Sequence, residues 1–275
     1  MSKLIAVDFK RVFKDKLFLV VCILAGVFAL ITPLLYAAIC LIPGVEDVLV
    51  DMGMGFNAKT LFFESFSPGN NMGLIAPLLI SIIFWKDFSH GTIRNKIISG
   101  QSRSSIILSM YTVCQLVLFG VLFLHALLSM VVSLIFFPYQ SEPFAASDIG
   151  YFFASLALEF LLCMVLSALA CWLCCVSNNM GLVIVGYLAI TMILSILLSL
   201  LSLGSFALST SEKWEIPLKI VGFFEDINLY TIAATIGSGR SYSVKQLLYC
   251  ILPNLVGTAG LMTWGILKFR KKDLK

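Results

Sequence analysis

Two ionisable side chains lie deep within apolar stretches of this 275-residue sequence, where they could do chemistry inside a membrane. His125 and Glu159 each fall about 11 or 12 residues from the end of a long apolar run, or roughly 17 Å along a helix that rises 1.5 Å per residue. Because their depths agree and their runs are consecutive, a hydrogen bond between them would offset the cost of burying either one alone. We expect His125 and Glu159 to form this hydrogen-bonded structural pair. Two alternatives stay open: each side chain bonds a serine or a backbone carbonyl independently, or the two act as a proton relay or contact a substrate.

Three of the eight cysteines, Cys171, Cys174 and Cys175, have a spacing that a metal site could use. No histidine and no second cysteine pair accompanies them, as a zinc site would require. All eight cysteines lie in or at the ends of apolar runs, so we interpret them as small packing residues and expect no metal.

The sequence contains no phosphate-binding loop of the form G-x-x-x-x-G-K-[ST], and the glycines at 237 and 239 lack its spacing. Hydrophobic residues make up 60% of the chain and charged residues only 12%, against roughly a quarter in soluble domains. The segments between the apolar runs are too short to bury a core. We therefore expect one membrane domain over residues 1–275, with no soluble enzymatic domain and no cofactor of its own.

Six apolar stretches are long enough to cross a hydrocarbon core of about 30 Å as helices. They cover residues 17–42, 72–85, 105–137, 149–176, 181–203 and 247–267. The second is short, so it needs its flanking residues or begins within the phenylalanine-rich stretch 61–66. The fold class expected is thus an all-α polytopic membrane protein with six transmembrane helices.

The basic residues gather in three clusters: five before residue 17, four between the second and third spans, and five after residue 267. With six spans all three clusters fall on one side, as the positive-inside bias requires. We expect a multi-pass protein of the cell membrane with both termini in the cytoplasm, and no nucleic-acid partner.

Two further segments should lie at the membrane surfaces. Residues 1–16 place Ile5, Phe9 and Val12 at helical spacing with basic residues elsewhere, which favours an interfacial helix over a simple charged leader. Residues 205–246 carry Lys219, Glu225 and Asp226, which make a seventh span expensive. We expect two short helices there, forming an outer-leaflet re-entrant hairpin that is broken near the acidic pair.

Three serines share one face of the fifth span. Ser195, Ser199 and Ser202 follow a spacing of four and then three residues. Small residues in this register are typical of close helix packing, which we favour, and a polar lining for a translocation path is the alternative.

The segment between the second and third spans, residues 86–103, combines an apolar side with basic residues around a Gly-Thr break. A short amphipathic helix that projects from a bundle is suited to a groove on a soluble partner. The basic residues Arg94, Lys96 and Arg103 are candidates for this contact.

This segment resembles the membrane subunits of type-2 ATP-binding cassette (ABC) exporters, whose signature is an acid, Gly-Thr, a basic residue and a Ser-Arg pair before the third span. Here the acid is Asp87 where that family often has glutamate, and Met110 stands where a lysine is common. The order of the elements along the whole chain is similar as well.

The resemblance implies a permease whose coupling helix contacts a separate ATPase, which binds the ATP and Mg. With the signature positions included, the residues expected at this contact are Asp87, Gly91, Thr92, Arg94, Lys96, Ser102 and Arg103. The partners implied are two ATPase copies, a second permease copy or a sibling, and the lipid bilayer. The substrate implied is hydrophobic or amphipathic, such as a peptide antibiotic, a lipid or a drug. A self-standing secondary transporter or a membrane scaffold is the alternative.

Overall fold

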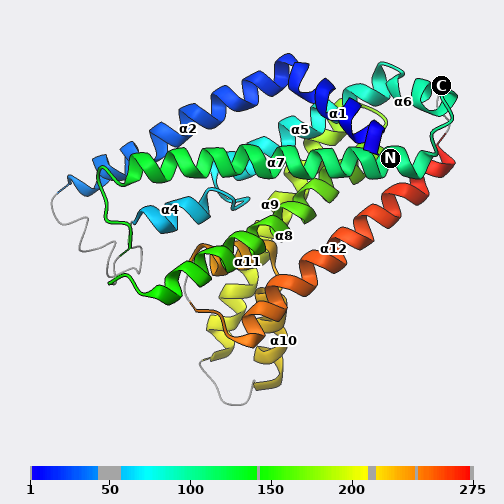
Figure 1. Ribbon diagram of the computed structural model, residues 1–275. Helices are drawn as coiled ribbons and strands as arrows, with labels where there is room; N and C mark the ends of the chain where they lie inside the picture. The colour runs from blue at the N-terminus through cyan, green and yellow to red at the C-terminus, as the bar shows by residue number, and fades with distance from the viewer. Residues whose placement is uncertain (1, 43–56, 141–142, 210–214, 239–240, 273–275) are drawn as a thin grey trace.

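A computed structural model describes residues 2–42, 57–140, 143–209, 215–238 and 241–272. All regular secondary structure in these ranges is helical (Figure 1). The expected all-α class is confirmed.

Six helices are long and apolar enough to cross a membrane, as expected. They are α2 (Lys16–Cys40), α5 (Asn71–Ser89), α7 (Arg103–Ser133), α8 (Ala146–Val176), α9 (Met180–Ser209) and α12 (Val244–Lys271). The short second span gains its length from its flanks and does not begin in the stretch 61–66, because that stretch belongs largely to a separate helix.

This separate helix is α4 (Ala58–Glu64), which the sequence interpretation did not predict as a helix of its own. Its Phe62 and Phe63 are fully buried and pack against Phe152 of α8, and Phe62 also meets Phe123 of α7. The chain then turns so tightly that a Cβ on Gly73 would lie 1.9 Å from the Ser67 carbonyl oxygen. Only glycine fits there, and it lets α5 begin after a short, tight turn.

Four shorter helices complete the described chain. They are α1 (Ser2–Lys14), α6 (Thr92–Ile98), α10 (Glu215–Asp226) and α11 (Leu229–Gly237). The break between α10 and α11 follows the Glu225, Asp226 pair, and Asn228 caps the second helix, so the predicted pair of short helices is confirmed. Part of the segment 205–246, including residues 210–214 and 239–240, lies outside the described residues, as do the acids at positions 46, 47 and 51.

The spanning helices pack around α5 and α8, which are the most buried of the six. The α8 helix lies along α12, and α2 lies along α7. The described parts of α1 and α6 and the end of α12 lie together at one end of the molecule, whereas α10 lies away from that end (Figure 1). We call these the terminal end and the far end.

Candidate functional site

The terminal end contains the segment that was expected to contact a partner. Its helix α6 is separated from α5 and α7 by two glycines in the left-handed region, Gly91 with φ of 69° and Gly100 with φ of 86°. Only glycine adopts this conformation without strain. Ile93 anchors α6 through a side chain that is 1% exposed.

Ion pairs fasten this segment to α1. The Lys96 ammonium lies 2.6 Å from a carboxylate oxygen of Asp8, whose other oxygen accepts a hydrogen bond of 2.8 Å from the Ser109 hydroxyl. Arg11 pairs with Asp87. Asp8 and Asp87 are 0% and 2% exposed, so these charges are buried between α1, α5, α6 and α7.

A further contact ties the start of α2 to the end of α5. Asp15 caps α2 by accepting a hydrogen bond from the Leu17 amide, and its carboxylate also receives two hydrogen bonds, of 2.8 and 2.9 Å, from Lys86. Burial raises the pKa of Asp15, but these hydrogen bonds and the neighbouring positive charges outweigh it, and the pKa lies below the ordinary 3.8. Burial lowers the pKa of Lys96, against the opposing effect of Asp8.

Arg103 and Lys272 fasten α12 to the same end. Arg103 donates hydrogen bonds of 2.9–3.1 Å to the carbonyl oxygens of Phe269, Arg270 and Lys272. Lys272 in turn donates to the carbonyl oxygens of Cys175 and Ser177 at the end of α8. These cations satisfy carbonyls that a helix end leaves without intrahelical partners.

The expected contact residues therefore divide into two groups. Asp87, Lys96 and Arg103 are engaged within the protein, Ser102 caps α7, and Gly91 and Thr92 form the turn into α6. Arg94 is exposed and forms no ion pair with any residue that the structure describes, and its neighbours Asn95 and Ile98 are exposed as well, the last to 74%. We call Arg94, Asn95 and Ile98 the α6 face.

The expected hydrogen bond between His125 and Glu159 is not formed. His125 Nδ1 donates to the Ala25 carbonyl oxygen of α2 at 2.8 Å, whereas Glu159 lies close to Cys250 of α12. The two residues are on the sides of α7 and α8 that face different neighbours, so similar depth does not bring them together. Glu159 is 0% exposed, and neither carboxylate oxygen has a hydrogen-bond partner among the described residues.

The serine face of α9, formed by Ser195, Ser199 and Ser202, is exposed. No other spanning helix in the described ranges packs against it. Ser202 and the nearby Ser205 donate hydrogen bonds of 2.9 and 2.7 Å to the carboxylate of Glu225 in α10. The end of this face thus holds the short helices against α9.

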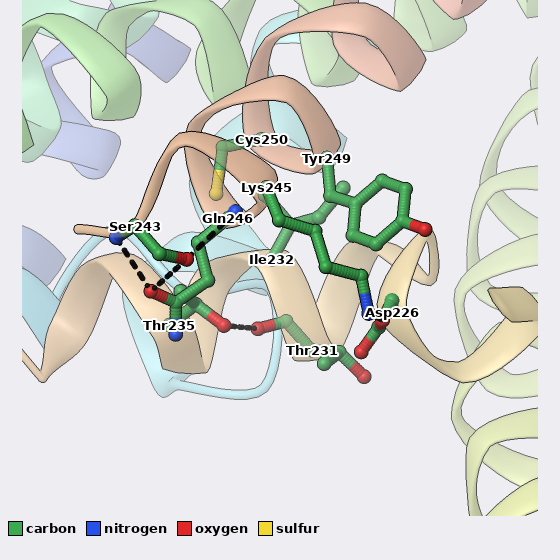
Figure 2. Close-up of a pocket in the computed structure, with 9 residues that line it drawn as sticks. All are labelled: Asp226, Thr231, Ile232, Thr235, Ser243, Lys245, Gln246, Tyr249 and Cys250. Atoms are coloured by element: carbon green, nitrogen blue, oxygen red, sulfur yellow. Dashed lines mark hydrogen bonds and ion pairs between the residues drawn. The ribbon is translucent and has the colours of Figure 1, made fainter. Parts of the chain in front are cut away.

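Two cavities lie on the far-end side of the molecule. One, of about 290 Å³, lies between α11 and α12. The side chains of Lys245 and Asp226 point toward one another there (Figure 2), and the Lys245 ammonium lies 3.3 Å from a carboxylate oxygen of Asp226. The other, of about 490 Å³, lies between α2, the turn from α4 to α5, and α11. We call it the Glu64 cavity, because Glu64 is the ionisable acid that lines it.

Several of these residues were missed by the sequence interpretation. Asp8 and Asp15 were not singled out within the expected interfacial segment, and Lys272 was counted only as one of five basic residues after residue 267. The alternation of these two acids with basic residues was a usable signal for ion pairs, but it did not identify the partners. Glu64 was not singled out either, although its phenylalanine neighbours indicated burial.

The fold is that of a multi-pass helical membrane protein. The chain belongs to DUF2705, a family described as proteins of unknown function, whose sequence profile matches residues 54–275. Comparison with curated proteins finds none that matches this chain.

Proposed function

We propose that this chain is the membrane-spanning permease subunit of an ABC exporter, located in the cell membrane with both termini in the cytoplasm. It is not itself an enzyme: a separate ATPase, in two copies, binds ATP and Mg and supplies the energy. The permease works as a pair, with a second copy or a sibling. Its cargo is a hydrophobic or amphipathic molecule.

The observation that carries this proposal is the α6 face on its rigid support. Helix α6 presents an exposed cation and an exposed apolar side chain, and buried ion pairs fix it to the rest of the protein. Such a helix is suited to bind a soluble partner and to transmit the partner's movement to the membrane helices. In this proposal α1 is the interfacial helix, α6 is the coupling helix, and α10 and α11 form the re-entrant hairpin.

The structure changes which side chains should make the contact. Arg103 was expected to face the ATPase, but it binds the end of α12. The coupling contact is therefore assigned to Arg94, Asn95 and Ile98, while Asp87 and Lys96 hold α6 in place.

The test is purification of the tagged full chain from its native membrane, with identification of any ABC ATPase and measurement of vanadate-sensitive ATP hydrolysis. The double variant Arg94→Glu, Ile98→Asp should lose the ATPase, whereas Lys10→Glu, an exposed cation on α1, should retain it. Retention of the ATPase and of normal hydrolysis by the double variant would contradict the coupling assignment.

A proton-coupled secondary transporter is a second candidate, favoured by the buried and unpartnered carboxylate of Glu159. If this candidate is correct, a pH gradient alone should drive transport in vesicles that contain only this chain. Glu159→Gln should then abolish the transport. The ABC proposal expects transport to need ATP and the partner, and to survive Glu159→Gln. A membrane scaffold would show transport under neither condition.

A further inference from the structure

The Glu64 cavity combines three features that suit one class of ligand. The wall from α2 is apolar at Leu35 and Ile39 and aromatic at Tyr36, the opposite wall includes Ala234 of α11, and the turn before α5 contributes amide groups such as that of Asn70. The cavity lies near the end of α2 that is distant from α1. Its volume of about 490 Å³ is within the range of small-molecule sites.

Glu64 gives this cavity a single charged group. No Lys or Arg among the residues that the structure describes forms an ion pair with it, and no base lines the cavity. Lys59, on the same short helix, instead interacts with Asp148. Within the part of the chain that the structure describes, the Glu64 carboxylate therefore has no internal cation, and it can attract one from outside.

Burial raises the pKa of Glu64 above its ordinary 4.5. The other titratable group that lines the cavity is Tyr36 of α2, while Ala233 and Ala234 of α11 and the turn before α5 contribute none. A bound cation would favour the ionised carboxylate, and a proton would compete with that cation.

The second cavity lacks this arrangement. There Asp226 is already paired with Lys245, whose ammonium also lies 5.1 Å from the centre of the Tyr249 ring. An internal cation therefore already occupies the carboxylate of this cavity, whereas no Lys or Arg among the described residues pairs with Glu64.

We propose that the Glu64 cavity binds an amphipathic monovalent cation, with its charge at the Glu64 carboxylate and its apolar body along Leu35 and Ile39 of α2. A carboxylate attracts a cation more strongly in a partly desolvated site than in water. As an assignment of the cargo class, this rests on the proposed function, whereas the binding itself requires no ATPase.

The probe is tritiated tetraphenylphosphonium, a cation with a bulky apolar body, bound to the full chain in nanodiscs of phosphatidylcholine. Saturable binding should weaken about tenfold in Glu64→Gln, which keeps the shape and removes the charge. Ala234→Leu fills the cavity from an exposed position and should weaken it similarly. Asp226→Asn, at the other cavity, should bind within about twofold of the unmodified protein.

Two measurements do not depend on the folding of any variant. The affinity of the unmodified protein should fall as the pH is lowered through the raised pKa of Glu64. Tetraphenylborate, which has the same body and a negative charge, should not compete. Equal affinity in Glu64→Gln, no pH dependence, or equal competition by tetraphenylborate would overturn the proposal.

The outcome is separable from that of the proposed function. If an ATPase copurifies but Glu64→Gln binds the probe normally, the cavity assignment alone fails. If the cavity binds as expected but no ATPase copurifies, the cation site stands and the ABC proposal fails.

Discussion

The terminal end and the far end of this protein are held together by different interactions. At the terminal end, α1, α5, α6 and α7 are joined by buried carboxylates and their cations, with Asp8 and Asp87 almost fully enclosed. On the far-end side, α4 is held by packed phenyl rings, and two cavities remain between the helices.

The two ends differ more in how strictly their helix arrangement is fixed than in how much stability their interactions add. A buried ion pair adds little net stability, because desolvation offsets the attraction, but breaking it leaves a costly unpaired charge. The terminal end is thereby restricted to one arrangement of its helices. Apolar packing restricts the far end less, and it can leave room for a ligand.

The largest effect should follow from Asp8→Asn. This change removes the nearer carboxylate from Lys96, whose side chain is only 10% exposed and which keeps Asp87 at 3.8 Å as its remaining partner. The free energy of unfolding should therefore fall by up to about 3–5 kcal/mol. Denaturant titration of the detergent-purified protein measures it.

The exposed Lys10 on the same helix is the control, and Lys10→Asn should change the free energy of unfolding by no more than about 0.5 kcal/mol. The double change Asp8→Leu, Lys96→Met should recover much of the loss, since it leaves no charge unpaired. A loss below about 1 kcal/mol for Asp8→Asn would remove the distinction between the two ends.

The next largest effect is expected for Arg103→Ala, which removes the side-chain donor to the carbonyl oxygens of Phe269, Arg270 and Lys272 at the end of α12. Its cost should be roughly 1.5–3 kcal/mol, the range for hydrogen bonds to charged groups. The same denaturant titration on Arg94→Ala, which removes an exposed guanidinium of α6, should give a change near zero. Equal costs would mean that Arg103 does not fasten α12.

The pH dependence of stability should have opposite signs at Asp15 and Glu64. The lowered pKa of Asp15 contributes stability that is present above pH 3.8 and lost as the pH falls through the folded-state pKa. The raised pKa of Glu64 has the reverse effect: stability is full below pH 4.5 and declines as the pH rises through the folded-state pKa.

Asp15→Asn should therefore destabilise at neutral pH, by about 0.2–1 kcal/mol since Lys86 is partly exposed, and should match the unmodified protein in strong acid. Glu64→Gln should instead gain stability relative to the unmodified protein between pH 4 and 7. Unfolding curves collected from strong acid to pH 7 would compare the two variants. If both variants changed stability in the same direction at neutral pH, the expected opposition between Asp15 and Glu64 would be contradicted.

The smallest effect is expected for Lys245→Met on the far-end side. Lys245 and Asp226 have side chains that are 69% and 39% exposed, so their ion pair should contribute at most about 0.5 kcal/mol. Thermal unfolding monitored by circular dichroism would detect a larger contribution, which would show that ion pairs matter at both ends.

The sequence was sufficient to predict what depends on pattern along the chain. Runs of apolar residues and their interruptions predict the six spans, the short helix after the second span, and the break after Glu225. The buried helix α4 was missed because its phenylalanine-rich stretch was considered only as a possible start of the second span.

The sequence was insufficient wherever the result depends on rotation about a helix axis. His125 and Glu159 have similar depths, but one side chain meets the Ala25 carbonyl oxygen of α2 and the other lies beside α12. For the same reason Arg103 could not be distinguished from Arg94, although the first binds the end of α12 and the second is exposed.

The glycines on either side of α6 determine the route by which a force would travel through this protein. Backbone torsion at Gly91 and Gly100 is soft, because no Cβ restricts rotation there. A load on α6 would therefore dissipate along the main chain toward α5 and α7. The stiff route runs sideways, from Lys96 through Asp8 into α1, and from Asp15 at the other end of α1 into α2 and α5. The first helix of the chain is thus a strut between α6 and the membrane-spanning helices.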